Sequence, residues 1–159
     1  MRNSSNKDIE SMYIMLKNSL SPYLMVNDFS SKNLQLIIDR DIVEDYVNRD
    51  VYLCLVVEIN SEIAGWVAGS SNTEVLSEHG CSLGDFYIEE IVVDFPYRRK
   101  GIGSFLLKGI PTDRLKAIVV DTPLINKPAI KFYEQSGFVK VLGLSEEFYK
   151  AWTRMSKPV

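Results

Sequence analysis

The sequence predicts an α/β fold with a central mixed sheet and helices on both faces. Three patterns support this class. Apolar residues recur at helical spacing near the start, an apolar hairpin pattern follows residue 50, and later apolar runs alternate with helix signals. The 159 residues, 46% hydrophobic and 25% charged, suffice for one domain with a sizeable core. We therefore expect a single domain over residues 1–159.

Two helices are predicted at the start of the chain. Ser5 followed by Asp8 indicates a helix start, because the Ser hydroxyl can satisfy a free backbone N–H there. "SP" at 21–22 should end this helix, since the residue before proline is pushed out of the α region. A second helix is expected to be capped by Ser31. The residues expected to face the core are Ile9, Met12, Tyr13, Leu16 and Leu20, then Leu34, Ile37, Ile38, Ile42 and Tyr46.

Strand patterns follow. "VYLCLVVEI" at 51–59 is β-branched and apolar, and a tight turn at 60–62 should lead into its hairpin partner "IAGWVAG". "DFYIEEIVVD" at 85–94 predicts a longer strand that ends before Pro96. A brief helix is expected at 101–110, strands at 115–121, 138–144 and 149–155, and a helix at 126–138 with Asn126 at its cap and Gly137 at its end.

Composition excludes several classes of protein. The net charge of −3 argues against general nucleic-acid binding, which favours a basic domain. No apolar run approaches the ~18 residues of a membrane span, and the polar start lacks the apolar region of a signal peptide. Cys54 and Cys81 are too few for a disulfide framework, so we expect a cytoplasmic protein with reduced thiols. The single histidine, His79, rules out a His-rich metal site, so no metal is expected, and its polar surroundings predict a solvated loop residue.

The stretch "YRRKGIGSF" at 97–105 places three cations before two glycines, between a predicted strand and a predicted helix. Glycine allows a ligand to approach the main chain closely, and unpaired N–H groups at the helix start favour anions such as phosphates. A Walker loop would need Gly-Lys-Ser/Thr, and a dinucleotide fingerprint would need a third glycine where Leu106 stands. The stretch fits neither of these.

The segment "IEEIVVDFPYRRKGIGSFLL" resembles the coenzyme A motif of the GNAT superfamily of acyltransferases, with Arg98, Gly101 and Gly103 at its defining positions. Farther along, "NKPAIKFYEQSGF" resembles the second motif of that family. Its matching positions are Asn126, Ala129, Tyr133, Gly137 and Phe138. The resemblance runs from about residue 51 to residue 138. It implies acetyl-CoA as cosubstrate and a GNAT-like sheet, whose first strand must be short or absent because only "MRN" precedes the first helix signal.

The resemblance also implies roles for individual residues. The pyrophosphate of the coenzyme would bind the loop formed by Arg98, Arg99, Lys100, Gly101, Ile102, Gly103 and Ser104. The pantetheine arm would pair with the strand backbone at Ile91, Val92 and Val93. Asn126 would contact the coenzyme, although capping a helix is the commoner role for such an asparagine. Tyr133 stands at the position of the family's general acid toward the coenzyme sulfur, and its alternative is an aromatic packed in the helix.

Acetyl transfer to an amine requires the ammonium to lose a proton. Glu89 and Glu90 interrupt an apolar strand, where carboxylates are depleted, and alternation places them on opposite faces. "YIEEIVV" is similar to the corresponding strand of diamine and glucosamine-phosphate acetyltransferases. By that resemblance Glu89 is the first candidate for the general base and Glu90 the second, while a solvent-facing side chain is the alternative for either.

The sequence thus predicts an N-acetyltransferase that moves an acetyl group to a primary amine of a small molecule by direct attack. A protein N-terminal or lysine acetyltransferase is the enzymatic alternative, and a silent coenzyme A-binding domain is the other. Pro111 cuts short the helix after the glycine loop. The sheet face that this leaves uncovered could be covered by a second copy of the chain, as a homodimer. No nucleic-acid or membrane partner is expected.

Overall fold

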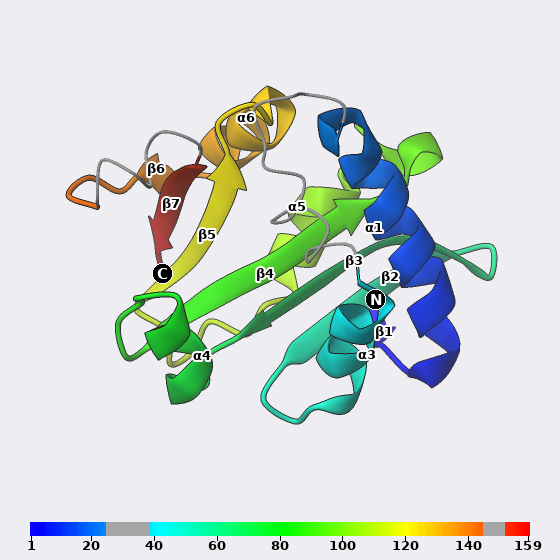
Figure 1. Cartoon of the computed structure of the whole chain (residues 1–159), viewed down its shortest axis with the longest axis horizontal. Coiled ribbons are helices and arrows are strands. Elements are labelled where there is room, and N and C mark those ends of the chain that lie inside the picture. Colours follow the sequence, from blue (N-terminus) through cyan, green and yellow to red (C-terminus); the bar gives the residue numbers. More distant parts are fainter. Residues whose placement is uncertain (25–38, 145–151) are drawn as a thin grey trace. The chain divides into compact units, whose positions relative to one another are not determined.

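A computed structural model describes residues 1–24, 39–144 and 152–159 of the chain. Its strands form a seven-stranded mixed sheet in the order β1-β2-β3-β4-β5-β7-β6 (Figure 1). This confirms the predicted α/β class, and β1 (Arg2–Asn3) is as short as expected. The chain divides into two compact units: Met1–Gly69 with Glu90–Ile110, called the first unit, and Ser70–Glu89 with Pro111–Val159, called the second unit.

The first unit opens with β1, a 3-10 turn η1 (Asn6–Asp8) and helix α1 (Ile9–Leu24). The backbone N–H and the hydroxyl of Ser5 both donate to Asp8 Oδ2, at 2.8 and 2.9 Å, which confirms the predicted helix start. The predicted end at Ser21–Pro22 is wrong, because α1 continues to Leu24. Pro22 stands in the last turn, where its missing N–H costs only one helical hydrogen bond. The predicted cap Ser31 lies outside the described residues.

Helix α3 (Arg40–Asn48) begins at Asp39, whose carboxylate accepts from the N–H of Asp41 at 3.1 Å. The hairpin of β2 (Leu53–Ile59) and β3 (Glu62–Ser70) follows as predicted. Ile59 pairs with Glu62, and the two residues between them have positive φ, 53° at Asn60 and 65° at Ser61. Two positive φ values match the twist of paired strands, which makes this turn suitable for a hairpin.

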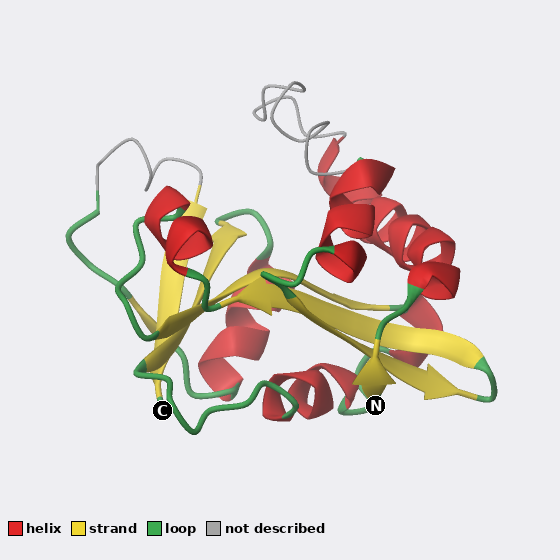
Figure 2. Cartoon of the chain, turned by 90° about the horizontal axis from the view of Figure 1, so that it is seen from below, coloured by secondary structure: helices red, strands yellow, loops and turns green. Residues whose placement is uncertain are grey.

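The core of the first unit forms on both faces of β2 and β3. One face carries Cys54, Val56, Trp66 and Ala68, and α1 and α3 pack on it through Ile9, Met12, Met15, Leu16, Val43 and Tyr46. The opposite face carries Gly65, which meets Ile102 and Leu106 of α5 (Ile102–Lys108). Because successive residues of a strand face opposite ways, the two helical layers use alternate positions. Helices on both faces are thereby confirmed, as Figure 2 shows.

The second unit contains the start of β4 (Asp85–Val93), which pairs in parallel with β5 (Ala117–Pro123). Strand β7 (Trp152–Pro158) runs antiparallel to β5, and β6 (Val139–Lys140) pairs with β7. The strand expected over 138–144 is therefore much shorter than predicted.

Two helices belong to this unit, α4 (Thr73–Glu78) and α6 (Lys127–Gln135). α4 lies in the polar stretch before His79, where the sequence predicts no helix. In the described residues, no helix combines the length and apolar character needed to cross a membrane.

Candidate active site

The predicted coenzyme loop leaves β4 through a short turn, η2 (Phe95–Tyr97). Arg98 Nε donates to the carbonyl of Val93 at 2.9 Å, and the Arg98 guanidinium lies 5.6 Å from the centre of the Phe95 ring. Lys100 Nζ lies 5.6 Å from the centre of the Tyr97 ring. The side chains of Arg98, Arg99 and Lys100 are all exposed. The turn thus holds two of these three cations against aromatic rings at the end of β4.

The backbone of this loop has the conformation that its glycine permits. Gly101 has φ +83° and Arg99 has φ +63°, so the chain turns sharply before the first bond of α5, from the N–H of Phe105 to the carbonyl of Gly101 at 2.9 Å. Apart from Gly101 itself and its two chain neighbours, no atom of the described residues lies within 4 Å of the position that a Cβ on Gly101 would take. The main chain is therefore open to a ligand here, and the surrounding cations suit an anionic one.

Gly65 of β3 fixes the approach of α5 to the sheet. A Cβ at Gly65 would lie 2.9 Å from the carbonyl oxygen of Val92 and 3.0 Å from Ile102 Cγ2. Real Cβ atoms do not tolerate such distances, so only glycine allows β3 to lie this close to the Val92 carbonyl and to the first turn of α5. An isolated glycine within a strand pattern is a sequence signal for such a close approach, and Gly65 carries it.

The other predicted residues of the first unit are in β4. Val92 is buried, whereas Glu90, Ile91 and Val93 are half-buried. The hydrogen bond from Arg98 to the Val93 carbonyl joins the predicted pantetheine strand to the predicted pyrophosphate loop.

Asn126 and Tyr133 lie on α6 in the second unit. Asn126 Oδ1 accepts from the N–H of Ala129 at 3.2 Å, so Asn126 caps the helix as predicted. Tyr133 is 4% exposed, and its ring centre lies 5.2 Å from that of Phe132 and 5.3 Å from that of Phe138. Gly137, with φ +89°, turns the chain so that the Phe138 N–H reaches the Tyr133 carbonyl at 3.0 Å.

The prediction that His79 is a solvated loop histidine is wrong. His79 caps the C-terminal end of α4, and its side chain is 30% exposed. Its ring stacks on the Tyr87 ring with centres 3.9 Å apart, and Nε2 lies 3.1 Å from Glu89 Oε1. The Glu89 side chain is 14% exposed. One of the two predicted carboxylates therefore has an imidazole partner, supplied by a helix that the sequence analysis did not anticipate.

A buried ion pair lies beside this group. Arg154 of β7 donates to both carboxylate oxygens of Asp121, at 2.6 and 2.8 Å, and Tyr87 donates its hydroxyl to Asp121 at 3.2 Å. Arg154 also donates to the carbonyl of His79 at 2.7 Å, which ties the end of α4 to β7. Burial raises the pKa of the Tyr87 hydroxyl, and the neighbouring Asp121 carboxylate adds to the effect. Tyr87 is therefore a hydrogen-bond donor here, not an acid that ionises near neutral pH.

Neither cysteine has the character of a nucleophile. Burial raises the pKa of Cys54 and of Cys81 to about 11. Because the thiolate is the reactive form, both side chains are unreactive thiols near neutral pH. In the described residues, no three His, Cys, Asp or Glu side chains are grouped so that they could hold a metal ion.

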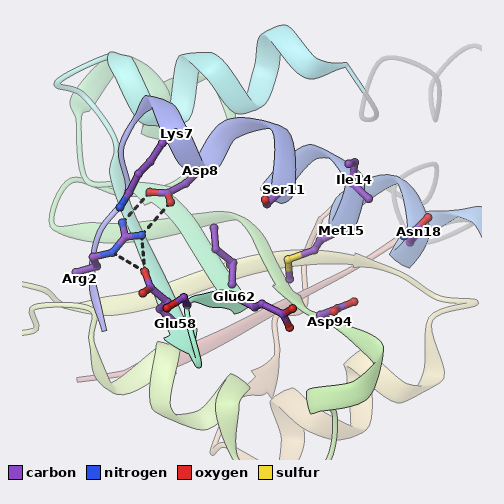
Figure 3. Close-up of a pocket in the computed structure, with 12 residues that line it drawn as sticks. Arg2, Lys7, Asp8, Ser11, Ile14, Met15, Asn18, Glu58, Glu62 and Asp94 are labelled. Atoms are coloured by element: carbon purple, nitrogen blue, oxygen red, sulfur yellow. Dashed lines mark hydrogen bonds and ion pairs between the residues drawn. The ribbon is translucent and has the colours of Figure 1, made fainter.

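A separate cavity of about 690 Å³ lies in the first unit between α1 and the β2–β3 turn (Figure 3). Arg2 bridges Asp8 and Glu58 at one end, while Glu62 and Asp94 also line the wall. None of the predicted site residues lines it. The Arg2 bridge links β1, η1 and β2, so it stabilises the start of the fold.

The profile of the acetyltransferase (GNAT) family matches residues 15–138, well over half of the chain. The chain belongs to this family. N-alpha-acetyltransferase 30 of Xenopus laevis is 28% identical over 126 residues, which cover 72% of this chain and 44% of that protein. L-ornithine N5-acetyltransferase NATA1 of Arabidopsis thaliana is 44% identical over 59 residues, 33% of this chain and 25% of that protein. The chain thus spans less than half the length of either relative.

Among solved structures, the PaiA N-acetyltransferase of Thermoplasma acidophilum, in complex with coenzyme A, aligns with a TM-score of 0.76 at 15% identity. The alignment covers 99% of this chain and 97% of that one. At such identity the likeness shows a shared GNAT fold.

In this GNAT chain the predicted residues fall into two groups. The first unit holds Glu90, Ile91 to Val93 and the glycine loop, and the second unit holds Glu89, Asn126 and Tyr133. Sequence reasoning missed His79, Arg154 and Gly65. The cap signal of α4 could have been read, since Asn72 Oδ1 accepts from the N–H of Glu74 at 2.9 Å, but no local pattern predicts the pairing of His79 with Glu89.

Proposed function

We propose that this chain is an acetyl-CoA-dependent N-acetyltransferase that acetylates a primary amine of a small molecule by direct attack. The observation that carries the proposal is the cationic glycine loop of a GNAT family member. It is open at Gly101, and Gly65 lets the helix that follows it, α5, pack closely on β3. A diphosphate needs main-chain N–H groups and positive charge close together, and this loop offers both.

Acetyl-CoA would supply the activated acyl group as a thioester. Residues 98–104 would hold its pyrophosphate, and the backbone of Ile91, Val92 and Val93 would pair with its pantetheine arm. The hydrogen bond of Arg98 to the Val93 carbonyl keeps these two parts of the first unit in register. Asn126 contributes through the N-terminal end of α6, whose first turn it caps.

The remaining chemistry is proton transfer by side chains of this chain. Tyr133 would protonate the leaving sulfur, and its packing between Phe132 and Phe138 supports that role by fixing the ring. Glu89 would serve the acceptor ammonium, with Glu90 as the second candidate. Both cysteine thiols stay protonated near neutral pH, which favours direct attack over a covalent intermediate on either cysteine.

The relatives bear on the acceptor. The short, more identical match is named for transfer to ornithine N5, the amine of a small molecule. The longer match is named for transfer to an α-amino group, so the N-terminus of a peptide is the second candidate acceptor. A chain with net charge −3 mildly favours a cationic amine.

Binding and transfer can be tested separately. Acetyl-CoA should raise the melting temperature of the protein, and Gly103→Glu should abolish that rise by placing a negative charge at the diphosphate. Lys108→Glu, a charge change at the far end of α5, is the matched control and should keep the rise. A full rise in Gly103→Glu would place the coenzyme elsewhere.

Acceptors should then be screened by release of free thiol from acetyl-CoA, with diamines and basic amino acids in one set and short peptides with free N-termini in the other. Turnover of the first set alone supports the proposed acceptor class. Turnover of the peptides alone supports the second candidate. Tight coenzyme binding with no turnover on either set would indicate a silent coenzyme A-binding domain.

A further inference from the structure

Three contacts within the second unit hold His79, one through its backbone and two through its ring. Its backbone carbonyl accepts from Arg154 at 2.7 Å, its ring stacks on Tyr87, and its Nε2 lies 3.1 Å from Glu89 Oε1. The turn after α4 adds a fourth constraint, because Gly80, with φ +62°, directs the Cys81 N–H to the Leu76 carbonyl at 2.8 Å. These contacts together fix the orientation of the His79 ring relative to Glu89 and Tyr87.

The contact with Glu89 determines which nitrogen carries the proton of a neutral imidazole. An ionised carboxylate can only accept hydrogen bonds, so Nε2 must be the donor. The second ring nitrogen, Nδ1, is then the atom that binds a further proton. A carboxylate that holds one nitrogen of an imidazole while the other takes up a proton is the arrangement by which acidic side chains orient histidine bases.

The charged groups around His79 differ in how closely they approach its ring. Arg154 is neutralised by Asp121, which it meets through two hydrogen bonds, so this pair contributes little net charge. Asp85 of β4 accepts from the Ser82 N–H at 2.9 Å, and Glu74 and Glu78 are exposed on α4. Cys81 and Tyr87 are neutral near pH 7. Glu89 is therefore the unbalanced charge in direct contact with the ring, and Tyr87 offers its aromatic face to an imidazolium.

We propose that the proton leaving the acceptor amine is taken up by the His79–Glu89 pair and comes to rest on the imidazole, not on the carboxylate. This rests on the proposed acetyltransferase function and assigns the roles within it. The ammonium loses one proton to the pair, both nitrogens of His79 are then protonated, and Glu89 balances the charge. The amine lone pair forms the new N–C bond as the C–S bond breaks, and Tyr133 gives its proton to the leaving sulfur. The nitrogen loses its second proton to solvent as the amide forms, His79 passes its extra proton to solvent, and Tyr133 regains one from solvent.

An imidazole suits this role better than a lone carboxylate. It is the side chain that ordinarily changes charge between about pH 5 and 8, whereas a carboxylate titrates near pH 4. A base whose proton affinity lies near the working pH is the most efficient. The pair thus predicts acetyl transfer that rises with pH through the titration of an imidazole.

The chain has one histidine, so the pairing can be tested without any acetyl transfer. The imidazole of the protein gives a single set of histidine NMR signals that needs no assignment. Glu89→Gln should move the midpoint of that titration to lower pH, because the carboxylate in contact with Nε2 is lost. Glu78→Gln removes the exposed carboxylate next to His79 in sequence and should move the midpoint far less. Equal shifts in the two variants would overturn the pairing.

The role of the pair is tested by the pH dependence of kcat/KM, with an amine that itself titrates well above pH 8. The wild type should show one inflection at the midpoint found by NMR. The inflection should be absent in His79→Gln, whose amide can still donate to Glu89, and the rate should fall by roughly 10²–10⁴-fold. In Glu89→Gln the inflection should move with the NMR midpoint.

The controls separate the possible failures. Asn72→Ala removes the cap of α4 without removing either titrating group, so it should change the rate while the inflection stays in place. An inflection that persists in His79→Gln and vanishes in Glu89→Gln would overturn the assignment and return the proton to Glu89, with the acetyltransferase function intact. Absence of any acetyl transfer would instead refute the proposed function, and the NMR titration would still decide the pairing.

Discussion

Arg154→Met should strongly destabilise the protein. The Arg154 and Asp121 side chains are only 9% and 10% exposed, and the two hydrogen bonds between them are 2.6 and 2.8 Å long. Methionine keeps the apolar stem but removes the guanidinium. Asp121 would then be a buried carboxylate without its cation, and the carbonyl of His79 would lose a donor.

The magnitude follows from the burial of the pair. Removing one partner of a buried ion pair costs about 3–5 kcal/mol, most of it the penalty of the charge left behind. For a chain of this size, 1 kcal/mol corresponds to roughly 2–4 °C in melting temperature, so a drop of roughly 6–20 °C is expected. Asp121→Asn in the same protein removes the stranded charge and keeps an acceptor for Tyr87. The double variant should therefore recover part of the loss.

Urea unfolding followed by circular dichroism measures these changes. Arg40→Met is the matched control, because Arg40 is 46% exposed and pairs with Glu44 of the same helix, an exposed ion pair that contributes little to stability. A loss of unfolding free energy in Arg154→Met no larger than that in Arg40→Met would show that the buried pair does not stabilise the second unit. A double variant less stable than Arg154→Met would show that the stranded Asp121 charge is not the cause of the loss.

Three further changes are expected. Gly65→Ala should cost about 1–3 kcal/mol in unfolding free energy and weaken acetyl-CoA binding in a thermal shift assay, because its Cβ would press on the Val92 carbonyl and on Ile102; an unchanged melting temperature would contradict this. Tyr133→Phe should keep acetyl-CoA affinity and lower turnover by roughly 10²–10⁴-fold, whereas full activity would leave Tyr133 a packing residue. The hydrogen bonds of Arg2 lower the pKa of Asp8 from 3.8 to about 2. They therefore add at most about 2 kcal/mol to the free energy of unfolding above pH 4, and this contribution is lost as the pH falls through about 2. Arg2→Met should remove that part of the acid dependence of urea unfolding, and an unchanged acid dependence would be evidence against the pair.

Features that depend on near neighbours in the chain could be predicted from the sequence. The Ser5–Asp8 start, the two-residue turn at Asn60 and Ser61, the Asn126 cap and the turn at Gly101 all depend on contacts within a few residues. The two stretches that resemble family motifs are of this kind, which is why the fold and the turn at Gly101 could be anticipated. The wrong helix end at Pro22 shows the limit of a local rule, since the preference of one residue can be overridden by the helix around it.

Contacts between distant parts of the chain were decided by the tertiary structure. His79 reaches Glu89 from a helix ten residues earlier, and Arg154 binds the His79 carbonyl across 75 residues. In the sequence nothing indicates a partner for His79, and the glycine signal at Gly65 does not tell which segment approaches it. Their roles exist only once β4, β5 and β7 are paired and α5 has packed on β3. Local preferences depend on small energies between residues close in the chain. The contacts of His79, Arg154 and Gly65 form only when packing brings distant segments together and removes them from water, so they depend on the whole fold.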